Sequence, residues 1–324
     1  MKKRISFFLL LFIVLGCHSE NDNLSPDVSN IPVEIKIHRF DKDFFGRPAE
    51  EFPNIKKKYP YIFPDKSPDS IWTQKMNDTL FLALKKEVDG VFPDFNKYSP
   101  GFKQLFQHIK YYFPGFKEPE IITIYSDWNY LNKVVYADSL MLISLDNFLG
   151  KNNPVYKGGV PDYIRQNLTP ERLPVEAGMA ISESLIPPLR NKAFLYKMIH
   201  QGKKVYLLNA FLPDTSGDLL LGYTPKKYKW AQKNEEEIWK YFVSNKLLYD
   251  SHPDLDRRFL NLAPYSKFYT ENDRNTPGQI GTYTGWQIVR AYMKNNNVSL
   301  QKMLQTPEEE IFKKSRYKPK KSWQ

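Results

Sequence analysis

Two glutamates in the second half of the chain have the spacing that best suits chemistry. Glu176 and Glu183 lie seven positions apart, so both fall on one face of any helix that spans them. A pair of carboxyl groups in one site can act as general acid and general base. Glu183 lies between Ile181 and Leu185, an apolar setting that would raise its pKa. The pair is therefore a candidate catalytic site, and two solvated glutamates on a helix edge are the alternative.

Other signatures of catalysis are missing from the sequence. It has no G-x-S-x-G, P-loop or G-x-G-x-x-G motif. None of its five histidines has a partner at a metal-ligand spacing, so neither a metal site nor a cofactor is expected. Three aspartates surround one histidine in the stretch Asp250, His252, Asp254 and Asp256. These carboxylates suit either a bound cation or, as we expect, the capping of the turn at Pro253.

The only cysteine, Cys17, stands where the chain changes from apolar to polar. Basic residues at positions 2–4 and an apolar run of about 12 residues precede it, which is typical of a secretory signal. The run is shorter than the roughly 20 residues that cross a bilayer. Residues 14–17 read Val-Leu-Gly-Cys and resemble a bacterial lipobox. We predict a lipoprotein signal peptide over 1–16 and acylation of Cys17, for example with palmitate. The alternative is a signal peptide with an incidental cysteine.

The amino-acid composition indicates what kind of protein follows this signal peptide. The chain is 41% hydrophobic and 15% aromatic, which suffices for a large core and is unusual for a disordered chain. Its formal net charge of +11 would suggest nucleic acid for a cytosolic protein, but an exported chain meets anionic lipids, glycans or acidic proteins instead. We predict a flexible tether over 17–30, a single domain over 31–324 and no nucleic-acid partner.

Short β-rich segments in the first half predict a small sheet. Residues 33–38 alternate in polarity, and 121–125, 134–136 and 141–145 are rich in β-branched and apolar residues. Because the connections between the later segments are short, we expect the sheet to be antiparallel. Residues 40–68 are rich in proline and aromatic residues and are expected to be irregular.

Helical spacing dominates the rest of the chain and must position the two glutamates. Predicted helices cover 72–91, 101–112, 169–186, 193–211, 228–249 and 281–294, with a last helix after Thr306. The helix over 169–186 carries both Glu176 and Glu183. The predicted fold class is therefore α+β, mostly helical, with a small N-terminal antiparallel sheet.

Four long runs resemble one known family over nearly the whole chain. They are His38 to Phe45, Ile181 to Pro187, Ala263 to Tyr269 and Gly278 to Val289. They are similar to the gliding-motility lipoprotein GldB family of Bacteroidetes. The resemblance implies a cell-envelope lipoprotein that is required for surface gliding and linked to the secretion system that feeds the gliding machinery.

The order of the motifs along the second half of the chain also resembles, more distantly, that of predicted zinc peptidases of the zincin type. Those proteins carry H-E-x-x-H on one helix and take a third ligand from an E-G pair on a second helix. In the corresponding places the first helix here has Ser182 and Ile186 where zincins have histidines. Gln201 stands at the third ligand position, and Glu183 keeps the place of the general base. The resemblance implies a zincin-like frame without its zinc ligands, a pseudo-peptidase that binds no metal.

Three functions stay open on these grounds. The first is a non-catalytic, lipid-anchored envelope protein that faces the periplasm and has components of the gliding and secretion machinery as partners. The second is an envelope hydrolase that uses Glu183 or Glu176 as acid and base. The third is a glycan- or peptidoglycan-binding lipoprotein in which aromatic rings stack on sugars.

Three short segments match an acceptor pattern for O-glycosylation in exported bacteroidete proteins. They carry Ser70, Thr79 and Ser139 as the acceptor residues, each after an aspartate. Because Ser70 falls in an expected loop, we predict it to be the best acceptor of the three.

Overall fold

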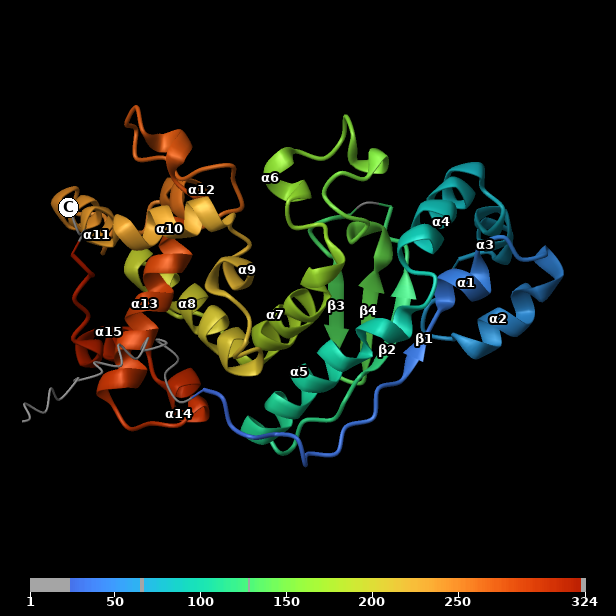
Figure 1. Cartoon of the computed structure of the whole chain (residues 1–324), viewed down its shortest axis with the longest axis horizontal. Helices are drawn as coiled ribbons and strands as arrows, with labels where there is room; N and C mark the ends of the chain where they lie inside the picture. Colours follow the sequence, from blue (N-terminus) through green and yellow to red (C-terminus); the bar gives the residue numbers. More distant parts are fainter. Residues whose placement is uncertain (1–23, 65–66, 128, 322–324) are drawn as a thin grey trace, which may run out of the picture.

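The structure is a computed structural model that describes residues 24–64, 67–127 and 129–321. The predicted signal peptide over 1–16, Cys17 and the first part of the predicted tether lie outside the described residues. A small sheet with flanking helices forms one half of the molecule, and the other half is helical (Figure 1). This arrangement confirms the α+β class with a helical majority.

The sheet contains four strands in the order β1-β2-β4-β3. Their bounds are β1 (Ile37–His38), β2 (Glu120–Ile124), β3 (Val134–Ala137) and β4 (Leu140–Ser144). The pairs β1–β2 and β2–β4 are parallel, and among the described strands only β3–β4 is antiparallel. The prediction of an antiparallel sheet is therefore wrong for two of its three pairs, β1–β2 and β2–β4.

Connection lengths explain this difference. The chain passes through five helices between β1 and β2, and through β3 between β2 and β4. Both routes are long enough for a parallel crossover. Only β3 and β4 are joined by a tight turn, at Asp138 and Ser139, and Asp138 takes the left-handed backbone conformation with φ of 53°.

Five helices precede or flank the sheet. Their bounds are α1 (Phe40–Phe44), α2 (Phe52–Lys58), α3 (Asp69–Met76), α4 (Thr79–Val91) and α5 (Ser99–Tyr112). The segment 40–68 was expected to be irregular, but it contains α1 and α2 because its aromatic residues bury one face of each helix. The α4 helix begins at a clear cap, since Asp78 accepts hydrogen bonds from the backbone N–H groups of Leu80 and Phe81.

The described part of the predicted tether packs against the domain. Val28 is buried, and Leu24 contacts the hydrophobic core. Gln107 of α5 donates a hydrogen bond to the carbonyl of Ile31 at 3.0 Å. Of residues 24–30, however, only Val28 is buried and four are exposed, so the flexible tether over 17–30 stays a prediction.

Ten further helices build the second half of the chain. Their bounds are α6 (Asp162–Arg165), α7 (Leu173–Leu185), α8 (Phe194–Phe211), α9 (Gly217–Leu221), α10 (Pro225–Lys233), α11 (Glu235–Ser244), α12 (Asp254–Phe259), α13 (Ile280–Asn295), α14 (Leu300–Gln305) and α15 (Glu308–Ser315). The helix predicted over 169–186 is a 3-10 turn over Pro170–Arg172 followed by α7. It ends where Ile186 becomes extended, directly before Pro187.

The single long helix predicted over 228–249 is two helices. Asn234 leaves the helical conformation with φ of −109° and ψ of 16°, between α10 and α11. Both its backbone N–H and its side-chain amide donate to the carbonyl of Trp230, at 3.0 and 2.8 Å, and close the end of α10. Glu235, Glu236 and Glu237 then start α11, where negative charge suits a helix N-terminus.

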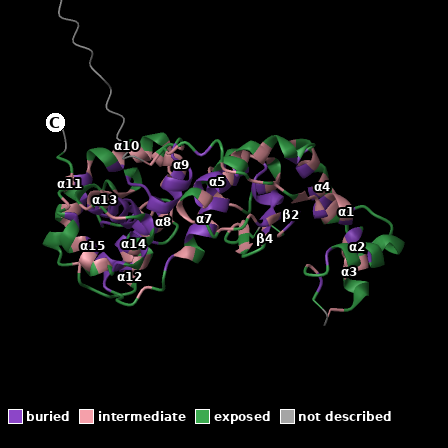
Figure 2. Ribbon diagram, turned by 90° about the horizontal axis from the view of Figure 1, so that it is seen from below, coloured by how far each residue is buried: buried purple, intermediate pink, exposed green. Residues whose placement is uncertain are grey.

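Helices α8 and α13 cross at very short range, and glycines make this possible. A Cβ atom on Gly285 would lie 1.7 Å from the carbonyl oxygen of Met198, and one on Gly202 would lie 2.2 Å from the backbone of Gly285. The two backbones therefore touch with no side chain between them. Buried residues concentrate along these helices, α7 and the sheet (Figure 2).

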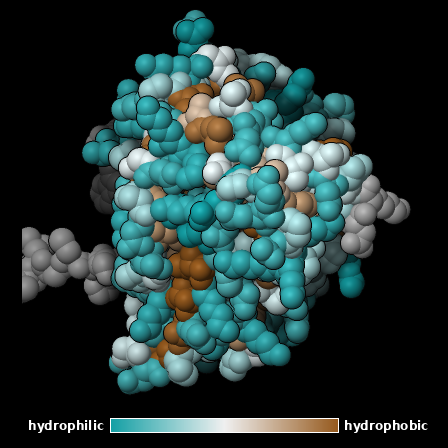
Figure 3. Space-filling view, turned by 90° about the vertical axis from the view of Figure 1, so that its right-hand side faces the viewer, coloured by the Kyte–Doolittle hydropathy of each residue, from teal (hydrophilic) through white to brown (hydrophobic). Residues whose placement is uncertain are grey.

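The end of the molecule that carries α2, α3 and α4 is largely hydrophilic on its surface, with apolar side chains gathered in narrow bands (Figure 3). Exposed apolar residues of this end include Tyr61, Ile71 and Leu80. Narrow apolar bands within a polar surface are ordinary for a soluble domain. Within the described residues, no helix combines the length and apolar character that crossing a bilayer requires.

Candidate functional site

A pocket of about 240 Å³ lies where α7, α8, α9 and the start of α13 meet, and we call it the central pocket. Its walls combine charged, amide, hydroxyl and apolar side chains. The residues that line it are Tyr130, Lys133, Ile164, Asn167, Arg172, Glu176, Met179, Glu183, Gln201, Lys204, Val205, Leu220, Leu221, Gly222, Tyr223, Leu262, Gln279 and Thr282. Glu176 and Glu183 both line it, as expected from their shared helix face.

Glu176 is the centre of an ion-pair cluster in this pocket. Its Oε1 atom lies 2.8 Å from Lys133 Nζ, 2.7 Å from Arg172 Nη2 and 3.0 Å from Arg172 Nε. The Glu176 side chain is only 15% exposed. Burial opposes its charged form, but the charges and hydrogen bonds of Lys133 and Arg172 outweigh burial and lower the pKa of Glu176 to about 2. Glu176 is therefore a permanent anion near neutral pH.

Glu183 occupies a different environment from the one that its neighbours in sequence suggested. Its side chain is 57% exposed, and Oε1 lies 3.1 Å from Lys204 Nζ. Ile181 is buried in the core, whereas Glu183 lines the pocket with more than half of its side chain exposed, because the two positions lie on different faces of the helix. The expectation of an apolar setting for Glu183 is therefore wrong.

The zincin resemblance assigns three residues to ligand positions and Glu183 to the general base, and the structure divides these four residues into two groups. Glu183 and Gln201 line the central pocket. Ser182 is fully buried and donates a hydrogen bond to the carbonyl of Gly178 at 2.8 Å, one turn earlier in α7. Ile186 belongs to the hydrophobic core. Packing thus occupies two of the positions, and the described residues contain no group of His, Cys, Asp or Glu side chains that could hold a metal ion.

Several residues of the pocket were not found from the sequence. Lys133 is 43 positions from Glu176 in the chain, so no local pattern pairs them. Arg172 precedes Glu176 by four positions, which is the spacing of a helical ion pair and a signal that could have been used. Thr282 and Gln279 lie in the run Gly278 to Val289, whose one signal in the sequence is its resemblance to a family.

Gln279 shapes one wall of the pocket through an unusual backbone. It takes the left-handed conformation with φ of 56°, which costs free energy for any residue other than glycine. Its carbonyl accepts a hydrogen bond from Tyr223 at 3.1 Å, and its side-chain amide donates to the carbonyl of Leu260 at 3.0 Å. These contacts hold the strained residue at the start of α13.

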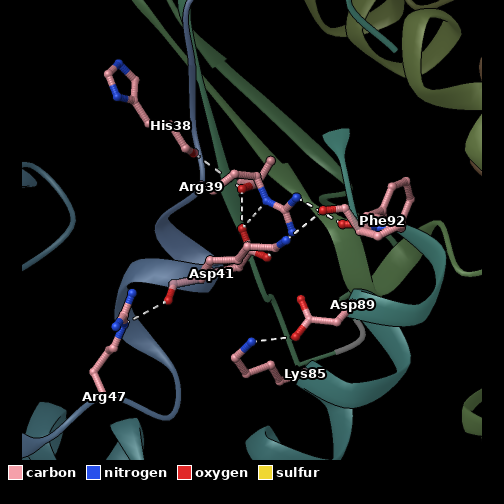
Figure 4. Close-up of polar contacts among 10 residues, drawn as sticks. His38, Arg39, Asp41, Arg47, Lys85, Asp89 and Phe92 are labelled. Atoms are coloured by element: carbon pink, nitrogen blue, oxygen red, sulfur yellow. Dashed lines mark hydrogen bonds and ion pairs between the residues drawn. The ribbon is translucent and has the colours of Figure 1, made fainter. Parts of the chain in front are cut away.

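A second polar cluster explains the run His38 to Phe45. Asp41 is fully buried and receives two hydrogen bonds from Arg39, at 2.8 and 2.7 Å, and one from Thr123 of β2 (Figure 4). Arg39 also donates to the carbonyl of Phe92 at 3.0 Å. The cluster ties α1 to the sheet and to the end of α4, so we interpret these charged residues as structural.

The aspartates around His252 are engaged locally. Asp250 accepts from the backbone N–H of His252 at 2.8 Å. Asp256 pairs with Lys197 at 2.7 Å, and Asp254 pairs with Arg257. The Asp250 contact agrees with the expected capping of the turn, whereas Asp254 and Asp256 form ion pairs that were not expected.

The three possible glycosylation acceptors are all exposed, but they differ in local structure. Ser70 lies in the first turn of α3, so the expectation that it lies in a loop is wrong. Thr79 begins α4. Ser139 lies in the turn between β3 and β4. Glycosylation of any of the three stays a prediction.

Comparisons with known proteins give one match. The family model described as "Gliding motility protein GldB" matches residues 21–319, which is nearly the whole chain. No curated protein and no solved structure matches the chain. The zincin-like frame therefore stays a prediction.

Proposed function

Because this chain belongs to the GldB family of gliding motility proteins, we propose that it serves gliding as a non-catalytic lipoprotein. In this proposal Cys17 carries the lipid, the membrane of the cell envelope holds the anchor, and the folded domain faces the periplasm. The partners are protein components of the gliding and secretion machinery. The domain contributes binding rather than chemical turnover.

The non-catalytic part of this proposal rests on the low pKa of Glu176. A general acid or base works best with a pKa near the operating pH. The pKa of Glu176 lies at about 2 because two cations hold its charged form. Both cations contact the same carboxylate oxygen, Oε1, and hold Glu176 in its charged form, so Glu176 suits an ion-pair role.

Glu183 supports the same interpretation. A hydrolase would need Glu183 to activate water, which requires a second group to polarise the reacting carbonyl or to bind the water. The neighbour of Glu183 is Lys204, which forms an ion pair with it. The two residues at the predicted histidine positions, Ser182 and Ile186, are buried in packing.

Conservative substitution of Glu183 separates this proposal from the hydrolase alternative. We expect cells that carry Glu183→Gln to glide at the wild-type speed, because the substitution removes only an exposed ion pair with Lys204. Tracking of single cells on glass gives the speed, and immunoblotting confirms equal protein levels. Loss of gliding at an unchanged protein level would contradict the proposal and favour the hydrolase.

A further inference from the structure

The ion-pair cluster of the central pocket carries an excess of positive charge. Lys133 and Arg172 together bring two positive charges to the single negative charge of Glu176. Their side chains are 17% and 8% exposed. The other two charged residues of the pocket, Glu183 and Lys204, neutralise each other. A largely buried cluster with one more positive than negative charge is unfavourable, so the pocket favours a ligand that brings a negative group.

Thr282 offers a second, independent indication of a ligand. The residue is 8% exposed, its side chain lines the pocket, and its Oγ1 atom is buried without a hydrogen-bond partner. By contrast, Thr284, two positions later in α13, donates to the carbonyl of Ile280 at 3.1 Å. A buried hydroxyl without a partner is unusual in native proteins. The Thr282 hydroxyl therefore lacks an acceptor, which a ligand bound against this wall would supply.

Apolar residues make up much of the remaining wall. Met179, Leu220, Leu221 and Leu262 line the pocket, and Leu262 is 45% exposed. A volume of about 240 Å³ corresponds to roughly eight water molecules. That space suits one or two amino-acid residues and is too small for a long oligomer.

We propose that the central pocket binds the C-terminal residue of a peptide, with the carboxylate against Lys133 and Arg172 and an apolar side chain against the leucines. The carboxylate neutralises the excess charge, and Thr282 donates a hydrogen bond to the ligand. A sugar acid would supply the same charge, but the four apolar residues favour an aliphatic side chain over a polar ring. This assignment goes beyond the proposed motility role and does not depend on lipidation of Cys17.

A matched pair of small molecules tests the assignment directly. N-acetyl-leucine and N-acetyl-leucine amide differ only in the charge of the terminal group, and each is titrated calorimetrically into the purified full-length protein. We expect the acid to bind about tenfold or more tightly than the amide, because charge-assisted hydrogen bonds to Lys133 and Arg172 are strong. Equal affinities, or no binding of either compound, would overturn the proposal. Tighter binding of glucuronate than of N-acetyl-leucine would overturn the peptide assignment.

Variants locate the binding in this pocket. Lys133→Met removes the excess charge and leaves a neutral pair of Arg172 and Glu176, so the protein still folds but loses its preference for the acid. Thr282→Val keeps the side-chain shape and weakens binding about threefold through the lost hydrogen bond. Lys240→Met removes an exposed cation of α11 outside the pocket and leaves binding unchanged. Wild-type affinity in Lys133→Met would overturn the proposal, whatever the variant does to gliding in cells.

Discussion

At the scale of single residues, the cluster of Glu176, Lys133 and Arg172 sets both the charge of the central pocket and the low pKa of Glu176. The same geometry that makes Glu176 unsuitable for proton transfer makes it important for stability. Two largely buried cations, Lys133 directly before β3 and Arg172 in the turn before α7, both contact the single anion Glu176 on α7. Removal of the anion leaves two cations in repulsion.

We therefore predict a large loss of stability for Glu176→Gln. Breaking a buried ion pair by neutralising one partner costs about 3–5 kcal/mol, because the other charges remain buried without a counter-ion. Urea denaturation followed by circular dichroism measures the change in the free energy of unfolding. Glu183→Gln is the matched control on the same helix, and its exposed pair with Lys204 is worth no more than about 1 kcal/mol. Equal effects of the two substitutions would contradict the account of the cluster.

The pH dependence of stability follows from the same residue. The pKa of Glu176 is about 2 in the folded protein, below the value of 4.5 that is usual for a free glutamate side chain. A lowered pKa adds stability that is fully present above pH 4.5 and disappears as the pH falls towards 2. We expect about 3 kcal/mol of stability to be lost across this window through Glu176. Glu176→Gln should reduce this loss, as unfolding curves from pH 5 to pH 2 would reveal. An unchanged acid profile in the variant would contradict the assignment.

At the scale of elements, the crossing of α8 and α13 is the most demanding contact of the fold. We predict that Gly285→Ala destabilises the protein by about 3 kcal/mol or more, because the added Cβ would overlap the carbonyl of Met198 and push the helices apart. Gly90→Ala in α4 is the matched control. A Cβ at Gly90 meets no atom within 4 Å, so this change should be neutral or stabilising by up to about 1 kcal/mol. Thermal unfolding compares the two, and a tolerated Gly285→Ala would contradict the packing.

Elements with strong local signals were predicted well from the sequence, and those set by distant contacts were not. The helical face that carries Glu176 and Glu183 follows from a seven-residue spacing, and both residues do line one pocket. Strand direction depends on crossovers through distant helices, so the parallel pairs were missed. Lys133 joins the site from the end of a loop before β3, and nothing near it in sequence indicates its partner. The exposure of Glu183 was missed because apolar sequence neighbours lie on other faces of a helix.

At the scale of the whole molecule, we propose that a lipid on Cys17 holds a peptide-binding domain at a membrane. The domain begins packing by Leu24, only a few positions after Cys17. The central pocket and the proposed anchor can be tested separately. Ligand binding to the pocket is measured on purified protein, and the need for the anchor is measured as the gliding speed of cells. Membership in the GldB family connects the domain to gliding, and the anchor is the feature that would place it at a membrane.

The most direct test of the lipid-anchored role removes the lipid and leaves the domain intact. Cells lacking the protein receive either the native form or a Cys17→Ala form behind an ordinary cleavable signal peptide, which releases the domain into the periplasm. Cell speed on glass is measured at matched protein levels, and fractionation confirms that the variant is soluble. The account predicts that the native form restores gliding and the soluble form does not. Full gliding with the soluble form would contradict the account.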